Sequence, residues 1–187
     1  MAKLQENQIK PIQTIYHGYK FRSRLEARWA IFFEHLGIKF EYEAEGYKNP
    51  GNPQAQEEIE KLYEPIGMPK PSTSKVDYWL PDFWLSEKDI LVEIKPITFL
   101  NSLGLGGESL PSDQYYFFAR FAATLDKHIF LIMGPPSPGE YRILWFQKGS
   151  GLAEDGFWEW AQCGNCLEGI WLTSSDIGAS SIFPCNE

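Results

Sequence analysis

Residues 76–96 read VDYWLPDFWLSEKDILVEIKP, and this stretch decides the fold that the sequence predicts. Two runs of apolar residues flank the polar segment Ser86–Asp89. Apolar runs joined by a short polar turn are the pattern of a β-hairpin. If the polar segment forms the turn, Leu85 faces Ile90, and the pairing of every other residue follows from that register.

The register predicts how the charged residues of the hairpin are placed. Asp82 lies directly opposite Glu93, and Leu80 lies opposite Lys95. Side chains alternate along a strand and cross-strand partners share a face, so Asp82, Glu93 and Lys95 point to one side. The other side is apolar and is the one expected to meet a core: Phe83, Leu85, Ile90, Val92 and Ile94. A slip of one residue would send the carboxylates into that core.

The shared face has a chemical interpretation. Two opposed carboxylates repel each other unless a cation lies between them, and Mg²⁺ prefers carboxylate oxygens, water and phosphate as ligands. A bound metal lowers the pKa of its water and polarises a phosphate, while Lys95 could orient that water. Together these groups suit phosphodiester hydrolysis. The alternative is a solvated hairpin face that carries an ordinary salt bridge.

Upstream, residues 23–37 (SRLEARWAIFFEHLG) predict an amphipathic helix. Apolar residues recur at helical spacing, and Gly37 stands where a C-terminal cap belongs. Ser23 and Glu26 match the capping box, in which both side chains satisfy free N–H groups at the helix start. Glu26 could also reach over the sheet edge toward the hairpin. Taken alone, the capping role is favoured.

The remaining segments complete an α/β (α+β) fold with a mixed sheet flanked by helices. Residues 38–43 alternate as a half-buried strand, residues 112–127 predict a second helix, and HIFLIMG and YRILWFQ predict two further strands. The expected organisation is an N-terminal extension at 1–15, a core at 16–147 with an insertion loop at 48–75, and a C-terminal appendage at 148–187.

Three stretches together resemble the PD-(D/E)XK nuclease superfamily: FRSRLEARWAIFFEHLGIKFEYE, YWLPDFWL and ILVEIKP. They are especially similar to small phage and mobile-element members and to the endonuclease subunit of heteromeric transposases. The resemblance covers about residues 16–147 and implies a restriction-endonuclease-like core that cleaves DNA with Mg²⁺ or Mn²⁺. It implies as site residues a helix glutamate, the PD aspartate and the ExK element: Glu26, Asp82, Glu93, the Ile94 backbone carbonyl and Lys95.

Other polar residues are weaker candidates for contacts with DNA. Arg22 and Arg24 flank the helix start and could bind phosphates, but solvated arginines would give the same pattern. Some branches of the superfamily carry a glutamine on the helix after ExK. Gln114 stands at that place, and a plain surface glutamine is the alternative.

The net charge of −8 is unfavourable for binding DNA, whose phosphates attract Lys and Arg. Basic residues gather in residues 16–28, whereas acidic ones gather in 57–64 and 154–168. A basic patch beside an acidic segment therefore remains an option. The second hypothesis is a non-cleaving DNA- or protein-binding module of the same fold. The acidity also suggests that a partner protein or a homodimer supplies the DNA-binding surface.

The cysteines raise a separate question. Cys163 and Cys166 form a CxxC pair, and with Cys185 they supply three of the four ligands of a structural Zn²⁺ site; free thiols are the alternative. An odd number of cysteines favours a reducing compartment. No apolar run approaches the ~20 residues of a membrane span, and the N-terminus shows no signal core. We therefore expect a cytoplasmic protein of a prokaryotic or phage-infected cell.

Overall fold

The computed structural model describes residues 11–49, 76–103, 113–125, 127–136, 140–149, 153–162 and 169–173. The expected insertion past residue 49 lies outside these residues, and so do Cys163, Cys166 and Cys185. The described ranges hold all the candidate site residues of the first helix, the hairpin and the second helix.

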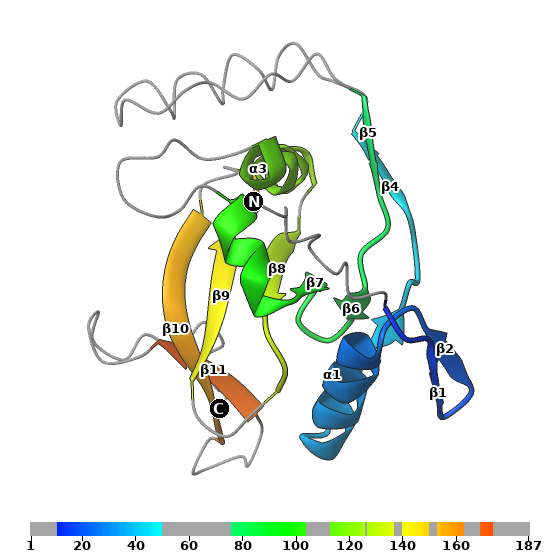
Figure 1. The fold of residues 1–187 in the computed structure, drawn as a ribbon. Coiled ribbons are helices and arrows are strands. Elements are labelled where there is room, and N and C mark those ends of the chain that lie inside the picture. The colour runs from blue at the N-terminus through cyan, green and yellow to red at the C-terminus, as the bar shows by residue number, and fades with distance from the viewer. Residues whose placement is uncertain are drawn as a thin grey trace, which may run out of the picture.

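Most described strands form one seven-stranded sheet with the order β11-β10-β9-β8-β7-β6-β3 (Figure 1). Strands β7 and β8 run parallel, and the other neighbouring pairs in this sheet are antiparallel. The sheet is therefore mixed, as predicted, and the α+β class is confirmed. The strands are β3 (Glu41–Tyr42), β6 (Phe83–Leu85), β7 (Ile90–Lys95), β8 (His128–Met133), β9 (Glu140–Phe146), β10 (Ala153–Gln162) and β11 (Gly169–Thr173).

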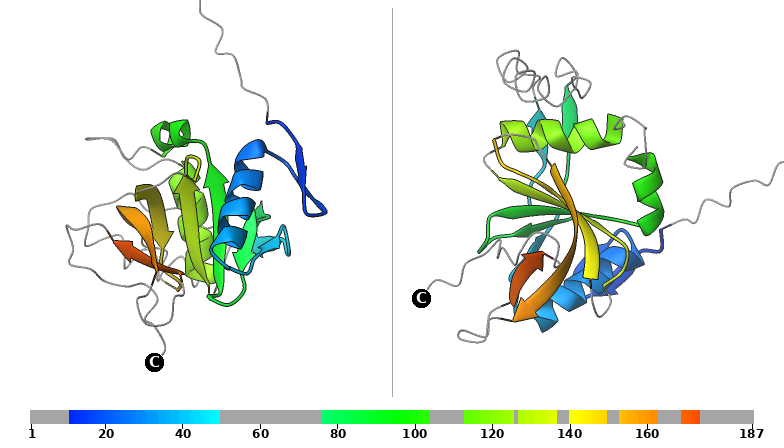
Figure 2. Two further views of the ribbon diagram at one scale, coloured as in Figure 1. Left: turned by 90° about the horizontal axis from the view of Figure 1, so that it is seen from below. Right: turned by 90° about the vertical axis from the view of Figure 1, so that its left-hand side faces the viewer.

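The parallel pair β7 and β8 has a crossover that contains helices. Parallel neighbours cannot be joined by a tight turn, so the chain must leave the sheet and return. Here it passes through the 3₁₀ helix η2 (Ile97–Ser102) and the α-helix α3 (Asp113–Thr124). Helix α3 covers one face of the sheet, and helix α1 (Arg24–His35) covers the other (Figure 2).

The hairpin of β6 and β7 has the register that the sequence predicted. Leu85 pairs with Ile90, and Phe83 pairs with Val92. The five residues expected to face a core are all buried in the cluster beneath α1, with exposures of 5% or less. The apolar side of the hairpin is thus confirmed.

The first strand of the hairpin is shorter than predicted. The run that was expected to continue from residue 76 to residue 85 divides at Leu80 and Pro81. Residues before the division form β5 (Asp77–Trp79), which pairs with β4 (Tyr47–Asn49) in a separate two-stranded ribbon. Proline has no N–H to donate to a ladder, so the strand cannot continue through Pro81. Asp82 therefore precedes β6 and is not a ladder partner of Glu93.

Helix α1 ends as predicted, with Gly37 in the cap that follows it. This residue has φ = +71°, a left-handed conformation that glycine adopts without strain. The N–H of Ile38 donates to the carbonyl of Phe33 at 2.8 Å, which closes a Schellman cap. Because Ile38 belongs to this cap, the strand expected at 38–43 is reduced to Glu41–Tyr42.

Two apolar clusters enclose the sheet. The cluster under α1 is rich in aromatic rings, among them Phe21, Trp29 and Phe33, and the cluster under α3 includes Leu91 and Phe121. Because β7 lies between the clusters, its residues are buried up to Ile94, including the charged Glu93. A strand covered on both faces carries apolar residues on both sides. A carboxylate at this place needs a specific reason.

A second ribbon, β1 (Thr14–Tyr16) and β2 (Tyr19–Phe21), stands beside α1 (Figure 1). Strand β1 begins within the segment expected to be an N-terminal extension. Strands β10 and β11 lie in the segment expected to be a C-terminal appendage, and they continue the large sheet. Among the described helices, none has the length and apolarity needed to cross a membrane.

The aromatic cluster under α1 gives the first prediction. Phe83 is fully buried and its ring lies 5.5 Å from the centroid of Phe33 and 5.4 Å from that of Phe40. Phe83→Ala should lower the free energy of unfolding by about 3–5 kcal/mol, because it removes packing and leaves a cavity. Urea denaturation measures the change. Ile15→Ala, at a side chain that is 76% exposed, is the control and should change it by less than ~0.5 kcal/mol.

Candidate active site at the end of strand β7

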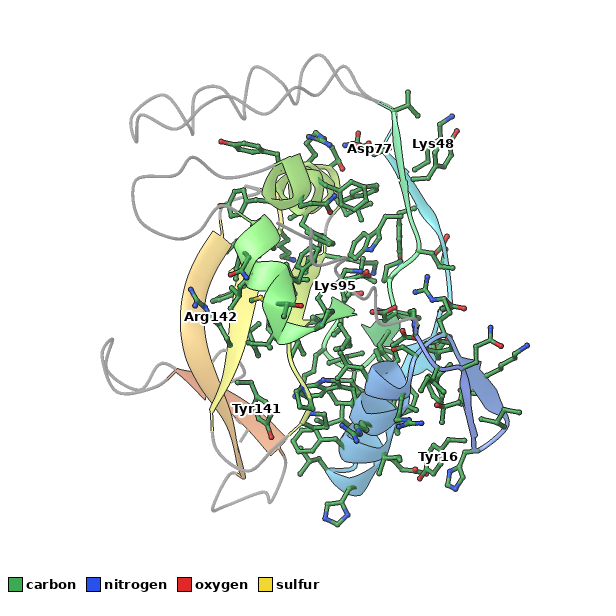
Figure 3. The ribbon with its side chains drawn as sticks, viewed as in Figure 1. Tyr16, Lys48, Asp77, Lys95, Tyr141 and Arg142 are labelled. Carbon is green, nitrogen blue, oxygen red and sulfur yellow. The ribbon has the colours of Figure 1, made fainter. Side chains whose placement is uncertain are left out.

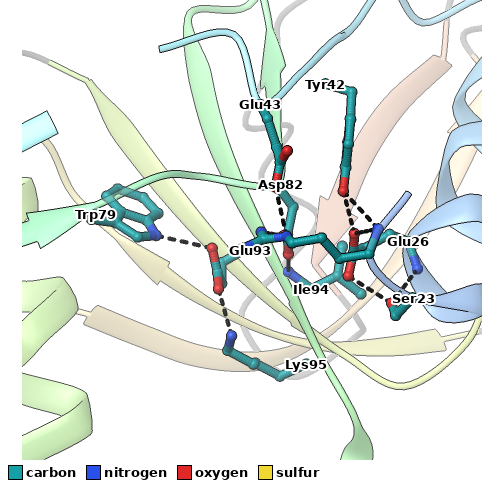
Figure 4. A network of polar contacts seen from close by, with 10 residues as sticks. Ser23, Glu26, Tyr42, Glu43, Trp79, Asp82, Glu93, Ile94 and Lys95 are labelled. Atoms are coloured by element: carbon teal, nitrogen blue, oxygen red, sulfur yellow. Dashed lines mark hydrogen bonds and ion pairs between the residues drawn. The ribbon is translucent and has the colours of Figure 1, made fainter. Parts of the chain in front are cut away.

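Charged side chains from three elements meet at the carboxyl end of β7. Lys95 and Glu93 come from β7, Asp82 from the segment before β6, and Glu26 from the first turn of α1 (Figure 4; Figure 3 places Lys95 in the whole chain). The position follows from the fold, because β7 ends between the two covering helices. The carboxyl ends of parallel strands are common places for functional groups in α/β proteins.

The three carboxylates are buried. Asp82 is 2% exposed, Glu93 is 6% and Glu26 is 7%. The expectation of a solvated face is therefore wrong, because the side of β7 that carries Glu93 is covered by the cluster under α3, although Glu93 and Lys95 do form the ion pair that this alternative included. The Lys95 side chain is 30% exposed, so solvent reaches this part of the site.

Asp82 takes the place of a missing strand partner. Strand β6 begins at Phe83, so the edge of β7 beyond Val92 has no ladder partner from β6. Asp82 Oδ2 accepts a hydrogen bond from the Ile94 N–H at 2.7 Å. The N–H and C=O of one strand residue point to the same side, so the Ile94 carbonyl also faces Asp82. A carboxylate and a backbone carbonyl thus share one edge of the sheet.

The second carboxylate, Glu93, has two partners of different kinds. Trp79 Nε1 donates to Oε2 at 2.9 Å, and Lys95 Nζ lies 2.5 Å from Oε1. Trp79 belongs to β5, so the ribbon that separates from the hairpin at Pro81 returns to hold Glu93 from the side. The tryptophan fixes the carboxylate, and the lysine compensates its charge.

The third carboxylate, Glu26, belongs to the helix cap and also lies near Asp82, but its side chain accepts the N–H of Arg22 and not, as the capping box predicted, that of Ser23. Ser23 Oγ accepts the N–H of Glu26 at 3.2 Å, which is the N-cap bond. The Ser23 hydroxyl donates to Glu26 Oε1 at 2.6 Å, and Glu26 Oε2 accepts from Tyr42 at 2.6 Å and from the Arg22 N–H at 3.1 Å. The helix is capped, and the carboxylate still lies near enough to Asp82 to raise its pKa.

The carboxyl group of Asp82 has a strongly raised pKa. Burial is the main cause that raises the pKa of this carboxyl to about 8, and the charge of Glu93 is the next. The Ile94 N–H and Lys95 lower the pKa of Asp82 but do not cancel these effects. A cation that bound beside Asp82 would favour its charged form and release a proton.

The donor set fits a hard divalent cation. It consists of carboxylate oxygens and a backbone carbonyl, the ligands that Mg²⁺ and Mn²⁺ take. In the present arrangement each carboxylate faces its own hydrogen-bond donors. Within the described ranges, no group of three His, Cys, Asp or Glu side chains is set around a single point. Binding of a cation would therefore require at least one carboxylate to exchange a present partner for the ion.

The other predicted site residues differ in their placement. Arg22 lies in the network, where it contacts Asp82 and Glu43. Arg24 is exposed at the start of α1, and Gln114 is exposed near the start of α3. In the part of the chain that the structure describes, neither Arg24 nor Gln114 forms an ion pair or hydrogen bond with the three carboxylates.

Three participants were not predicted as site residues: Tyr42, Glu43 and Trp79. Tyr42 falls on the apolar side of the predicted strand, yet its hydroxyl reaches Glu26. Trp79 falls within the continuous hairpin strand that the sequence predicts. The signal that could have revealed it is Pro81, because a proline there ends the ladder and leaves the preceding residues to pair elsewhere.

Comparison with known proteins adds no relative. No protein-family model matches the chain, and searches of curated proteins and of solved structures found no match.

The raised pKa of Asp82 predicts how stability depends on pH in the absence of divalent cations. Its pKa is about 8 in the folded protein and 3.8 without the fold, so folding takes up a proton between these values. The contribution of Asp82 to the free energy of unfolding therefore falls as pH rises through this window. Asp82→Asn cannot ionise. Its stability relative to wild type should improve from pH 5 to pH 8.

Urea denaturation in EDTA at the two pH values measures this change. Asp89→Asn is the matched control, because Asp89 is an exposed carboxyl in the hairpin turn. The control should keep the wild-type pH profile. If Asp82→Asn and wild type show parallel profiles, the raised pKa of Asp82 is wrong.

Proposed function

We propose that this protein is a metal-dependent DNA endonuclease of the PD-(D/E)XK type, with a restriction-endonuclease-like core. The observation that carries the proposal is the meeting of Asp82, Glu93 and Lys95 at the end of β7, with Glu26 beside them. Carboxylates are costly to bury. A metal-binding role explains why three of them lie together where apolar residues would be more stable.

The proposed ligands of Mg²⁺ or Mn²⁺ are Asp82, Glu93 and the Ile94 carbonyl, with Glu26 assisting. When bound, the cation would polarise the scissile phosphate and lower the pKa of an attacking water. The chain contributes the positions of these oxygens. Trp79 and the Ile94 N–H hold Glu93 and Asp82 in place, so little reorganisation is needed when charge develops.

Lys95 has the role of positioning the attacking water and stabilising negative charge on the phosphate. Its ammonium group lies 2.5 Å from Glu93 and 5.7 Å from the ring centroid of Phe99, and its side chain is 30% exposed. The backbone of Lys95 is fixed as well, because its carbonyl accepts the Gly134 N–H at 2.8 Å. A fixed backbone and a partly exposed head suit a residue that must meet a substrate.

The DNA-binding surface is the less supported part of the proposal. The net charge of −8 disfavours DNA at long range, and Arg22 is held by acidic side chains. We therefore propose that a partner protein or a second copy of the chain adds positive charge around the site. The proposed setting is the cytoplasm of a prokaryotic or phage-infected cell, with an origin in a phage or mobile element.

Cleavage assays test the function directly. Plasmid and branched DNA are incubated with Mg²⁺, with Mn²⁺ and with EDTA. Wild type should nick DNA only with a divalent cation, and Lys95→Ala should lose at least about a hundredfold in rate. Lys39→Ala is the control, since Lys39 forms an exposed ion pair with Glu87 away from the site.

Absence of cleavage on every substrate, with DNA binding that needs no metal, would overturn the nuclease proposal. That result would favour the second hypothesis, a binding module of the same fold.

The hydrogen bond from Trp79 to Glu93 yields a further prediction. Trp79→Phe keeps an aromatic ring in the cluster under α3 but removes the N–H donor. A hydrogen bond to a charged group is worth about 1.5–3 kcal/mol, so the cleavage rate should fall at least about tenfold. Trp145→Phe is the matched control, because Trp145 donates to His128 far from the carboxylates. Equal loss in both variants would contradict a specific role for Trp79.

A further inference from the structure

The side chain of Arg22 lies directly beside Asp82 at the candidate site. Its Nη2 lies 2.5 Å from Asp82 Oδ1, and its Nε lies 2.6 Å from Glu43 Oε1. Arg22 precedes the helix cap, and half of its side chain is exposed, whereas Asp82 is buried. The guanidinium therefore reaches from the surface into the site.

The two oxygens of Asp82 have different partners. Oδ2 is held by the Ile94 N–H inside the sheet, and Oδ1 is held by Arg22. The partner at Oδ2 is backbone in the central strand and cannot leave without disturbing β7. The partner at Oδ1 is a half-exposed side chain that can rotate into water. Oδ1 is thus the oxygen of Asp82 whose partner can be exchanged.

Arg22 also touches the carboxylate on the helix side of the site. Its backbone N–H donates to Glu26 Oε2 at 3.1 Å and to the Tyr42 hydroxyl at 3.0 Å. These backbone contacts keep the residue in place even when its side chain moves. Glu43, which forms an ion pair with Arg22 Nε, offers an anchor for the side chain when its Nη2 leaves Asp82.

We infer that Arg22 is a positioning residue that stands in for the divalent cation in the metal-free protein. Its guanidinium holds Asp82 Oδ1 and leaves this oxygen when the cation binds there. The inference rests on the proposed function, because it assumes that Asp82 is a metal ligand. Since one oxygen cannot hold both partners in the same position, Arg22 and the cation compete.

The competition determines how much the loss of Arg22 should change the affinity for Mn²⁺. A half-exposed ion pair contributes up to about 1 kcal/mol, so removing Arg22 should tighten binding of Mn²⁺ by up to about fivefold. A residue with a purely structural role would have the opposite effect or none, because its loss would loosen the site. Metal-free stability should decrease at the same time, since Asp82 loses its partner.

Isothermal titration with Mn²⁺ at pH 8, without DNA, measures the affinity of wild type and Arg22→Ala. Arg24→Ala is the matched control. It removes one positive charge at the same end of α1, but Arg24 has no contact with Asp82, so the control reports the effect of charge alone. Arg22→Lys keeps the charge and should lie between wild type and Arg22→Ala. Circular dichroism in EDTA verifies that each variant is folded, and Arg22→Lys carries the test if Arg22→Ala does not fold.

The expected result is tighter Mn²⁺ binding by Arg22→Ala than by Arg24→Ala, with lower stability in EDTA. If wild type and both Arg22 variants bind Mn²⁺ with equal affinity, the inference is wrong while the proposed metal site stands. If no variant and no wild-type protein binds Mn²⁺, both the inference and the proposed function are wrong.

Discussion

The hydrogen bond between the Ile94 N–H and the Asp82 carboxylate is the interaction on which the candidate site depends. It exists because β6 stops at Phe83, where Pro81 prevents the ladder from continuing. An unpaired backbone N–H in a buried strand is unfavourable, and here a side-chain oxygen satisfies it. The same bond draws Asp82 into the interior beside Glu93. The break between β5 and β6 and the gathering of buried carboxyl groups beside β7 therefore have one cause.

The charge of the site is balanced by side chains that reach it from outside the strand interior. Arg22 pairs with Asp82, whose raised pKa keeps a proton on it near neutral pH, and Lys95 pairs with Glu93. Replacing such groups with apolar residues of similar size often stabilises a protein. The proposed metal site would explain why these groups lie in the core despite their cost in stability.

Helix α1 has a double role in this arrangement. Its cap, formed by Ser23 and Glu26, fixes the start of the helix and places a carboxylate at the site. Further along, Trp29 Nε1 donates to the Gly134 carbonyl at 2.9 Å, and the Gly134 N–H donates to the Lys95 carbonyl. The helix is thereby tied to the ends of β7 and β8, and its position relative to Lys95 is fixed by hydrogen bonds as well as by packing.

The sequence by itself determined the local structure: the register of the hairpin from Leu85 and Ile90, the cap at Ser23, the end of α1 at Gly37, and the proximity of Glu93 and Lys95. Each depends on residues a few positions apart, whose geometry is set by turn, strand or helix rules. Only the tertiary structure decided that Trp79 leaves the hairpin and returns to Glu93, that Tyr42 and Arg22 meet Glu26, and that Arg22 faces Asp82. These contacts join residues from separate elements, and they depend on how the helix and the ribbons pack around β7, which no local pattern encodes.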